Sequence, residues 1–278
     1  MSAEDVIEQE ADEGAAESAG ELEFLACAGG EAAAYTARCP DREGLNEDVG
    51  AVMPLGETRA ILAVADGMGG PPGGAQAASI AIDALIATVQ KAPADEIDLR
   101  ALVLNGFETA NDRLLELGVG SGTTLAVVEL DGGFVRSYHA GDSVILIVGQ
   151  RGKIKLQTVA HSPVGYAVEA GLLDAQEAIH HEDRHLVSNI VGSPEMRIEI
   201  GPSLALAARD TIVLGSDGLF DNLHVAEVIQ IVRKGPLQEA AQALADLARR
   251  RMLHPEAGQP SKADDLTFIV YRPSGKPH

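Results

Sequence analysis

Residues 60–70, AILAVADGMGG, carry the strongest structural signal in this chain. The first six residues are all apolar, and a short apolar run of this kind is typical of a strand that is buried on both faces. Asp66-Gly67 follows at once and marks the end of the strand. Residues 211–218, TIVLGSDG, repeat the arrangement and place Asp217-Gly218 after a second apolar run. The two stretches predict buried strands whose tips carry carboxylates.

More strands are predicted between these two. Residues 124–130 and 134–140 flank Asp131-Gly132-Gly133, which is a signal for a hairpin turn. Residues 144–148 form another apolar run and follow Gly141-Asp142-Ser143. We expect a second hairpin at this position, with Asp142 in its turn.

Four helices are predicted, chiefly from apolar side chains that recur at helical spacing. They cover residues 75–90, 99–117, 225–234 and 237–252. Because groups of strands and pairs of helices alternate along the chain, we expect an α+β domain with helices packed outside a mainly antiparallel sheet system. Residues 160–192 are polar and only partly helical, and we interpret them as an insertion that lies on the sheets.

The composition indicates where the domain lies and which partners are unfavourable. Residues 1–23 are rich in Glu, Asp, Ala, Ser and Gly, which is typical of a disordered acidic tail, so the folded domain is predicted to cover residues 24–273. A formal net charge of −21 argues against nucleic acid and anionic membranes as partners. No secretory signal or membrane-spanning stretch is visible. We expect a monomer.

Two cysteines, Cys27 and Cys39, are present, and neither belongs to a CxxC pair. This pattern favours a reduced compartment, so we expect a cytoplasmic protein without a zinc ribbon or a redox dithiol. Neither cysteine begins a CxxxxxR loop, which argues against dephosphorylation by a cysteine nucleophile.

Acidic residues stand at the ends of the predicted strands. They are Glu47-Asp48, Asp66, Asp142, Asp217 and Asp264-Asp265. A single Asp-Gly after a strand is usually only a turn. If these tips meet at one end of the sheets, however, each pair of carboxylates at roughly 5–6 Å repels by about 3 kcal/mol at an effective dielectric near 20. Bound cations would relieve this repulsion.

The ligand type indicates which cations these would be. Ligand sets made only of oxygen favour hard ions, so Mg²⁺ or Mn²⁺ is expected rather than zinc. Two such ions that share a carboxylate would lower the pKa of a bound water and hold the oxygens of a phosphate. This chemistry suits the hydrolysis of phosphomonoesters, which is very slow without a catalyst.

Six segments follow one another between about residues 46 and 270: LNEDVGAV, AVADGMGG, SGTTLAVV, HAGDS, GSDGLFD and DDLTFIV. In this order they resemble the PPM family of metal-dependent Ser/Thr protein phosphatases, the type 2C kind, and DGMGG and SDGLFD are similar to its bacterial branch. The resemblance implies a two-sheet antiparallel β-sandwich flanked by helix pairs, a four-layer α-β-β-α arrangement with metals at one end. It also implies that residues 160–192 are the family's flap insertion.

The resemblance implies a metal-binding role for most of the acidic residues. Asp66 would bridge two metal ions, and the Gly67 carbonyl would bind one of them. Asp217 and Asp264 would bind the other ion, and Glu47 would hold a metal through water. Two or three Mg²⁺ or Mn²⁺ ions are therefore expected.

The resemblance also implies the reaction and its partners. Asp48 would orient the nucleophilic water, and Asp142, with Asp217, would form a weaker third metal site. The substrates would be phosphoproteins, and a functionally opposing Ser/Thr kinase would supply them. The family's phosphate-binding Arg is replaced by Glu43, which makes the adjacent Arg42 the candidate for that role; Arg38 is further away.

Other family positions also differ. Many members have His inside or just after the DGxGG motif, where this chain has Met68 and Pro71. GDSR is replaced by GDSV, with Val144, and the usual Asp-Asn before the last strand is Asp264-Asp265. These changes support an alternative function, in which a catalytically weak phosphatase-fold module binds phosphoproteins. The full set of expected metal carboxylates favours the enzyme.

Three further patterns suggest other sites and are set aside. GMGGPPGG lacks the glycine of a dinucleotide fingerprint at Pro72 and the lysine of a P-loop. The histidines at 180, 181 and 185 lie near acidic residues, but a solvated flap helix explains them better than a metal site. His139 and His161 are expected to have polar structural roles.

Overall fold

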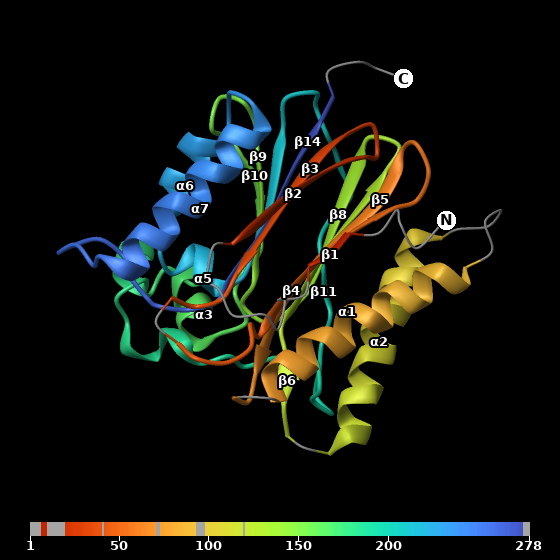
Figure 1. Ribbon diagram of the computed structural model, residues 1–278, viewed down its shortest axis with the longest axis horizontal. Helices are drawn as coiled ribbons and strands as arrows, with labels where there is room; N and C mark the ends of the chain where they lie inside the picture. The colour runs from red at the N-terminus through yellow and green to blue at the C-terminus, as the bar shows by residue number, and fades with distance from the viewer. Residues whose placement is uncertain are drawn as a thin grey trace.

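The chain folds into four layers, with two β-sheets face to face and a pair of helices against the outer face of each (Figure 1). The predicted α+β class and α-β-β-α arrangement are confirmed. The computed structural model describes residues 7–9, 20–40, 42–70, 73–92, 98–118 and 120–274.

The first sheet has eight strands in the order β1-β4-β5-β7-β8-β11, with β6 beside β5 and β12 beside β8. Its pairings are antiparallel. The predicted hairpin between β7 and β8 is present. The strands are β1 (Ile7–Gln9), β4 (Asp48–Pro54), β5 (Arg59–Met68), β6 (Gly122–Thr123), β7 (Leu125–Asp131), β8 (Phe134–Ala140), β11 (Glu199–Ile200) and β12 (Leu204–Ala205).

The second sheet has six strands in the order β10-β9-β13-β14-β3-β2. They too pair antiparallel. The strands are β2 (Glu21–Cys27), β3 (Gly30–Ala37), β9 (Val144–Val148), β10 (Ile154–Gln157), β13 (Thr211–Gly215) and β14 (Leu266–Pro273).

The apolar run in β5 is continuous because both of its faces are buried. Ile61 and Ala63 pack into the core between the first sheet and its helices. Leu62 and Val64 point the other way, into the core between the two sheets. Successive side chains of a strand alternate between faces, and each large apolar side chain contributes about 1.5–3 kcal/mol when buried. Packing on both faces therefore fixes the position of the strand end that carries Asp66.

Helices α1 (Gly73–Lys91) and α2 (Leu99–Leu117) cover the first sheet, and α6 (Val225–Val232) and α7 (Leu237–Leu253) cover the second (Figure 1). The ends of α2 agree with the prediction because both are capped. The Asp98 side chain accepts a hydrogen bond from Ala101 N at 3.2 Å, and Gly118 ends the helix at a φ of 63°. A short helix, α5 (Asp217–Phe220), follows β13 directly.

The N-terminal boundary differs from the prediction. The composition predicts a disordered tail that includes residues 21–23, but these residues begin β2, which pairs with β3 along its whole length. Leu22 packs against the core between the second sheet and its helices, and Leu25 packs against the core between the two sheets. The side chains of this acidic segment therefore point to opposite faces, as in a strand. Ile7–Gln9 also pairs, with β4. The other residues of the predicted tail, 1–6 and 10–19, lie outside the described residues.

The second predicted hairpin is wrong. Strand β8 belongs to the first sheet, whereas β9 pairs with β10 and β13 in the second. Gly141-Asp142-Ser143 therefore connects the two sheets. Gly141 has a φ of 114°, which favours glycine, and a Cβ there would lie 2.6 Å from the Thr124 Cβ. This crossover carries Asp142 to the end of the sandwich.

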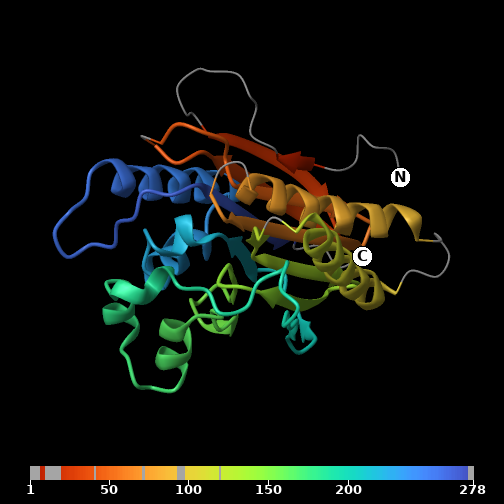
Figure 2. The same ribbon diagram turned by 90° about the horizontal axis from the view of Figure 1, so that it is seen from below.

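The segment 160–192 contains three short helices, α3 (Pro163–Glu169), α4 (Ala175–Ala178) and a 3₁₀ helix (Glu182–His185). Seen from below, it lies beside the sandwich at one end, near α5 (Figure 2). Its Val191 forms an isolated bridge with Thr123. In the described part of the chain, no helix has both the length and the apolar character that a membrane crossing requires.

Candidate active site

Asp48, the first residue of β4, lies directly opposite Asp66, near the end of β5. Carboxylates at opposed positions of an antiparallel pair repel each other. Burial, followed by the charge of Asp265, raises the pKa of Asp48 well above its usual value. Burial, followed by the charge of Asp48, does the same to the pKa of Asp66. Two adjacent carboxylates that both resist ionisation indicate a place where a cation would be stabilised.

Glu47 and Gly67 place two more oxygens beside this pair. Gly67 N donates a hydrogen bond to Glu47 O at 2.9 Å. Glu47 Oε1 is buried without a hydrogen-bond partner among the described residues. A Cβ at Gly74, in the first turn of α1, would lie 2.6 Å from Glu47 Oε1 and 2.9 Å from Gly67 O. The glycine thus leaves both oxygens open.

Asp217 and Asp142 reach the same place from the other sheet and from the crossover. Asp217 begins α5, and the preceding Ser216 donates a hydrogen bond from Oγ to Asp48 Oδ2 at 2.7 Å. Burial raises the pKa of Asp217 to about 8 against the opposing effect of Lys262. Burial, followed by the charge of Asp221, raises the pKa of Asp142 to about 6. Both carboxylates are thus held in a crowded acidic site.

Asp264 and Asp265 complete the acidic cluster from the loop before β14. Asp265 is buried, and its two oxygens accept hydrogen bonds from Cys39 N at 2.6 Å and Glu47 N at 2.7 Å. A carboxylate at this position satisfies two backbone donors, whereas an Asn would offer one acceptor oxygen. Asp265 therefore anchors the loop that carries Glu47, and Asp264 is left to face the site.

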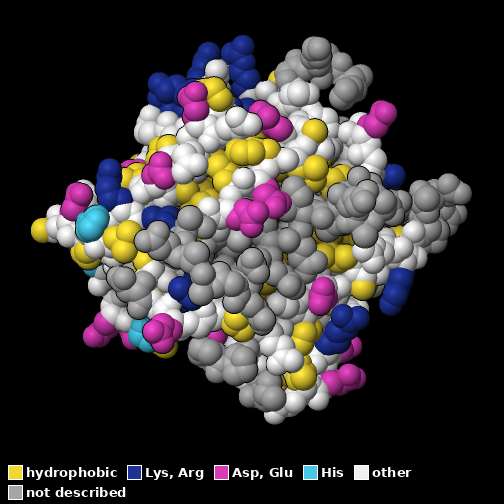
Figure 3. All heavy atoms as spheres, in the orientation of Figure 1, with side chains coloured by type: hydrophobic (Ala, Val, Ile, Leu, Met, Phe, Trp, Pro, Cys, Tyr) yellow, Lys and Arg dark blue, Asp and Glu magenta, His cyan; other side chains and the backbone are white. Residues whose placement is uncertain are grey.

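The net negative charge is divided between the surface and this site. Figure 3 shows Asp and Glu side chains scattered over one face of the molecule. Asp48 and Asp265, in contrast, are only 2% and 5% exposed. A carboxylate buried among others is costly unless a cation compensates it, so this part of the charge is the part that indicates chemistry.

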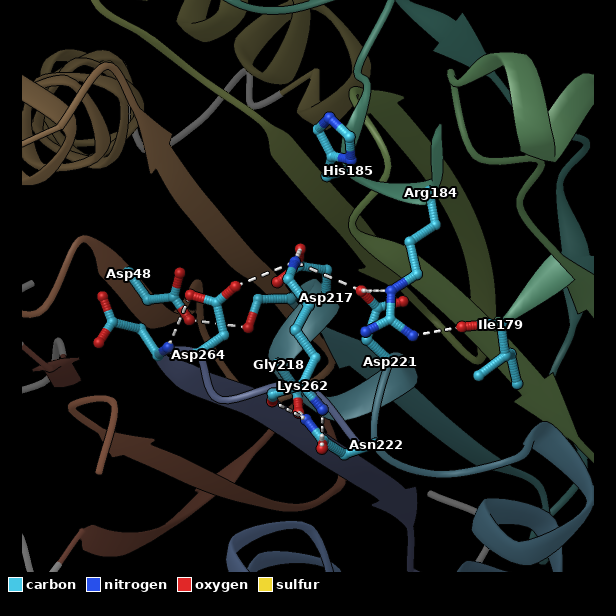
Figure 4. A network of polar contacts seen from close by, with 12 residues as sticks. Asp48, Ile179, Arg184, His185, Asp217, Gly218, Asp221, Asn222, Lys262 and Asp264 are labelled. Carbon is cyan, nitrogen blue, oxygen red and sulfur yellow. Dashed lines mark hydrogen bonds and ion pairs between the residues drawn. The ribbon is translucent and has the colours of Figure 1, made fainter. Parts of the chain in front are cut away.

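Three residues that the sequence analysis missed belong to the cluster: Asp221, Lys262 and Arg184, whose Nε lies 3.7 Å from Asp221 Oδ2 (Figure 4). Lys262 Nζ contacts Asp217 Oδ2, lies 2.9 Å from Asp264 Oδ2 and lies 3.3 Å from Asp221 Oδ2. Burial lowers the pKa of Lys262, but the charges of these three carboxylates raise it overall. The spacing of Asp221, four residues after Asp217, was a usable signal; nothing in the sequence pattern marked Lys262.

Arg42 extends toward the cluster, and Arg38 does not. Arg42 Nη1 lies 3.7 Å from Asp264 Oδ1, and its side chain is half exposed. Arg38 donates from Nη1 to the carbonyl of Gly44 at 3.1 Å, on the surface. Of the two arginines, Arg42 is the one whose guanidinium borders the site.

His139 and His161 are buried and stacked on each other, with ring centroids 4.3 Å apart. Together with Glu199, they place three potential ligand atoms within 4.8 Å of one another. His161 Nδ1 already accepts hydrogen bonds from Gly141 N at 3.1 Å and Asn189 Nδ2 at 2.9 Å. These contacts tie the segment 160–192 to the crossover that carries Asp142, which gives His161 a structural role.

The surroundings of the thiols argue against a cysteine nucleophile. Cys27 and Cys39 are both buried, and neither forms a disulfide with any described residue. Burial raises the pKa of Cys27 to about 12, so its reactive thiolate is scarce at neutral pH.

The residues of the acidic cluster fit a site for divalent metal ions. The candidate donors are all oxygens, which hard cations prefer. Several are buried carboxylates that repel one another, and Glu47 Oε1 lacks a partner among the described residues. The glycines at positions 67 and 74 keep the space beside these oxygens free of side chains.

A family model described as protein phosphatase 2C matches residues 39–250. The chain belongs to the protein phosphatase 2C family. A protein phosphatase 2C-type protein from Streptococcus pyogenes is 30% identical over 203 residues, which are 69% of this chain and 80% of that protein. The family assignment makes the chain a metal-dependent serine/threonine protein phosphatase, a hydrolase whose substrates are phosphoproteins.

Solved structures support the same assignment. The Streptococcus agalactiae serine/threonine phosphatase matches this phosphatase with a TM-score of 0.73 and 27% identity, over 91% of this chain and 99% of that one. The catalytic domain of the phosphatase PstP in complex with 2 manganese ions matches with a TM-score of 0.67 and 27% identity, over 87% and 96% of the two chains.

Proposed function

We propose that this phosphatase acts on phosphoserine and phosphothreonine with two or three Mg²⁺ or Mn²⁺ ions held by the acidic cluster. Asp66 would bridge two ions, with the Gly67 carbonyl and Glu47 on one side. Asp217 and Asp264 would hold the second ion. The observation that supports this proposal best is the opposed pair of buried carboxylates Asp48 and Asp66, because a cation held beside them would relieve their repulsion. Asp142, with Asp217, would form a weaker third site.

Asp48 would position the attacking water. When bound, the metal ions would lower the pKa of this water and stabilise charge on the phosphate. The Ser216 hydroxyl donates a hydrogen bond to Asp48 Oδ2, so the other oxygen of Asp48 would accept a hydrogen bond from the water. Its position opposite Asp66 would place that water at the bridging carboxylate.

Metal dependence is the decisive test. The purified protein should hydrolyse a phosphothreonine peptide and p-nitrophenyl phosphate in Mn²⁺ or Mg²⁺, and an excess of chelator should abolish both activities. The measurement is phosphate release with and without the metal, with restoration when metal is returned. Full turnover in excess chelator would disprove the metal mechanism. Peptide binding without turnover in any metal would favour the alternative, a phosphatase-fold module that only binds phosphoproteins.

The phosphate group of the substrate would be held by Arg42 as well as by the metals. A guanidinium can donate two parallel hydrogen bonds to phosphate oxygens, which a metal ion alone does not reproduce. Arg42 lies at the edge of the cluster, 3.7 Å from Asp264, and is half exposed, so a substrate could reach it.

Arg42→Ala is expected to raise KM for a phosphothreonine peptide by about ten-fold, because it removes a charge-assisted contact worth about 1.5–3 kcal/mol. Affinity for Mn²⁺ should stay within a few-fold of the parent. Arg38→Ala is the matched control, since it removes a nearby exposed guanidinium that bonds only to Gly44 O among the contacts described. If Arg38→Ala raised KM and Arg42→Ala did not, the phosphate role would pass to Arg38.

We propose a cytoplasmic monomer that reverses the action of a Ser/Thr kinase. Two buried cysteines outside any disulfide of the described residues are compatible with a reducing compartment. Gel filtration would test the oligomeric state directly.

A further inference from the structure

Lys262 is held in place by a buried asparagine. Asn222 is fully buried, and its side-chain amide makes two hydrogen bonds with the backbone of Lys262, from Lys262 N at 2.9 Å and to Lys262 O at 2.8 Å. The same amide donates to Gly218 O at 2.9 Å, next to Asp217. The main chain of Lys262 is therefore fixed relative to α5, and its side chain enters the cluster from a defined position (Figure 4).

The ammonium of Lys262 lies among the very oxygens that the proposed second metal ion requires. It contacts Asp217 Oδ2 and lies 2.9 Å from Asp264 Oδ2, and these are the two carboxylates assigned to that ion. It also lies 3.3 Å from Asp221 Oδ2. The Lys262 side chain is only 22% exposed, so the charge is directed inward.

We propose that Lys262 is the counter-cation that Asp217 and Asp264 share, and that a metal ion binding at these two carboxylates must displace its ammonium. Mg²⁺ binds carboxylate oxygens at about 2.0–2.1 Å. An ammonium that keeps its contacts with the same oxygens would be close enough to repel that ion strongly. The two cations therefore compete for one place.

This competition has two consequences, and both rest on the proposed metal site. In the metal-free enzyme, Lys262 partly neutralises three carboxylates and stabilises the fold. When metal binds, the same contacts must be broken. Lys262 therefore weakens the metal site at Asp217 and Asp264 relative to the first site, at Gly67 and Glu47. The chain would thus bind its metals stepwise, with the second ion as the weaker one.

The test compares the parent with Lys262→Met by titration calorimetry with Mn²⁺ and by thermal unfolding in excess chelator. Lys262→Met should bind the second Mn²⁺ ion, at Asp217 and Asp264, about ten-fold more tightly, within the usual range for coupled binding. Its melting temperature should fall in chelator and recover in Mn²⁺. Lys155→Met is the matched control, because it removes a lysine paired with buried Asp210 outside the cluster. It should leave Mn²⁺ affinity unchanged.

The outcomes separate this inference from the proposed site. If the parent binds Mn²⁺ and Lys262→Met binds it equally or more weakly, competition is excluded while the metal site stands. If neither protein binds Mn²⁺, both proposals fail. Should Lys262→Met fold only when metal is present, the inference is supported, and Lys262→Gln, which keeps a polar end without the charge, should show the same gain in affinity.

Discussion

Asp66→Asn and Asp217→Asn are each expected to lower kcat on a phosphothreonine peptide by about a thousand-fold or more. Each change removes a charged ligand from a metal site whose contribution to the transition state is several kcal/mol, and each 1.36 kcal/mol corresponds to ten-fold in rate. The measurement is turnover at saturating Mn²⁺ with the fold checked by circular dichroism. Asp83→Asn, an exposed change on α1, should leave turnover unchanged.

Asp66→Asn should not lose stability in the absence of metal. Burial, followed by the charges of Asp48 and other carboxylates, raises the pKa of Asp66, so this group destabilises the metal-free fold when it is ionised. The Asn keeps the shape and removes the charge. In chelator, Asp66→Asn should therefore melt at or above the temperature of the parent. Equal loss of turnover in Asp66→Asn, Asp217→Asn and Asp83→Asn would show that the site has been placed incorrectly.

The parts of the fold that could be predicted from sequence are those with a local physical cause. Strand β5 follows from a run that is apolar on both faces, and α2 follows from its apolar stripe, its Asp98 cap and Gly118. Strand β2 is not predicted because its acidic residues resemble those of the tail, and its Leu22 and Leu25 face two different cores rather than repeating at a spacing of two. Composition therefore outweighed a weak periodic signal.

The crossover at Asp142 was mispredicted because two kinds of connection look alike in sequence. A Gly-Asp-Ser turn between apolar runs fits a hairpin as well as a passage from one sheet to the other. The choice depends on which neighbours β9 finds, and these are β10 and β13, which come later in the chain. Strand β10 follows β9 closely, but β13 lies far along the chain, and this long-range pairing leaves no mark near the turn.

In the acidic cluster too, residues positioned by distant contacts could not be predicted from the sequence. Asp66 and Asp217 could be predicted because each stands at the tip of a buried strand. Lys262 could not, because an isolated lysine in a polar loop is usually a solvated surface residue. Its inward position depends on Asn222, forty residues earlier in the chain. The acidic residues of the cluster are therefore easier to predict from the sequence than the lysine that contacts them.

Gly67→Ala is expected to abolish turnover and to lower the free energy of unfolding by about 3 kcal/mol. A Cβ at this position would lie 2.0 Å from Gly74 O and 2.8 Å from Glu47 O, and both of these atoms belong to the backbone. Neither can move without shifting α1 or the start of β4, and overpacking of this kind typically costs about 1–3 kcal/mol. The shift would also displace Glu47 and the Gly67 carbonyl, so affinity for Mn²⁺ should fall together with stability.

The matched control for this change is Gly132→Ala in the turn between β7 and β8. Gly132 has a φ of 55°, and a Cβ there meets nothing within 4 Å, so only the backbone conformation is strained, at about 1–2 kcal/mol. The turn lies beside Arg59, at the other end of β5 from Asp66. Gly132→Ala should therefore lose stability and keep parental kcat and Mn²⁺ affinity. If Gly67→Ala also kept both, the close packing of α1 against the Asp66-Gly67 tip would not be needed to form the metal site.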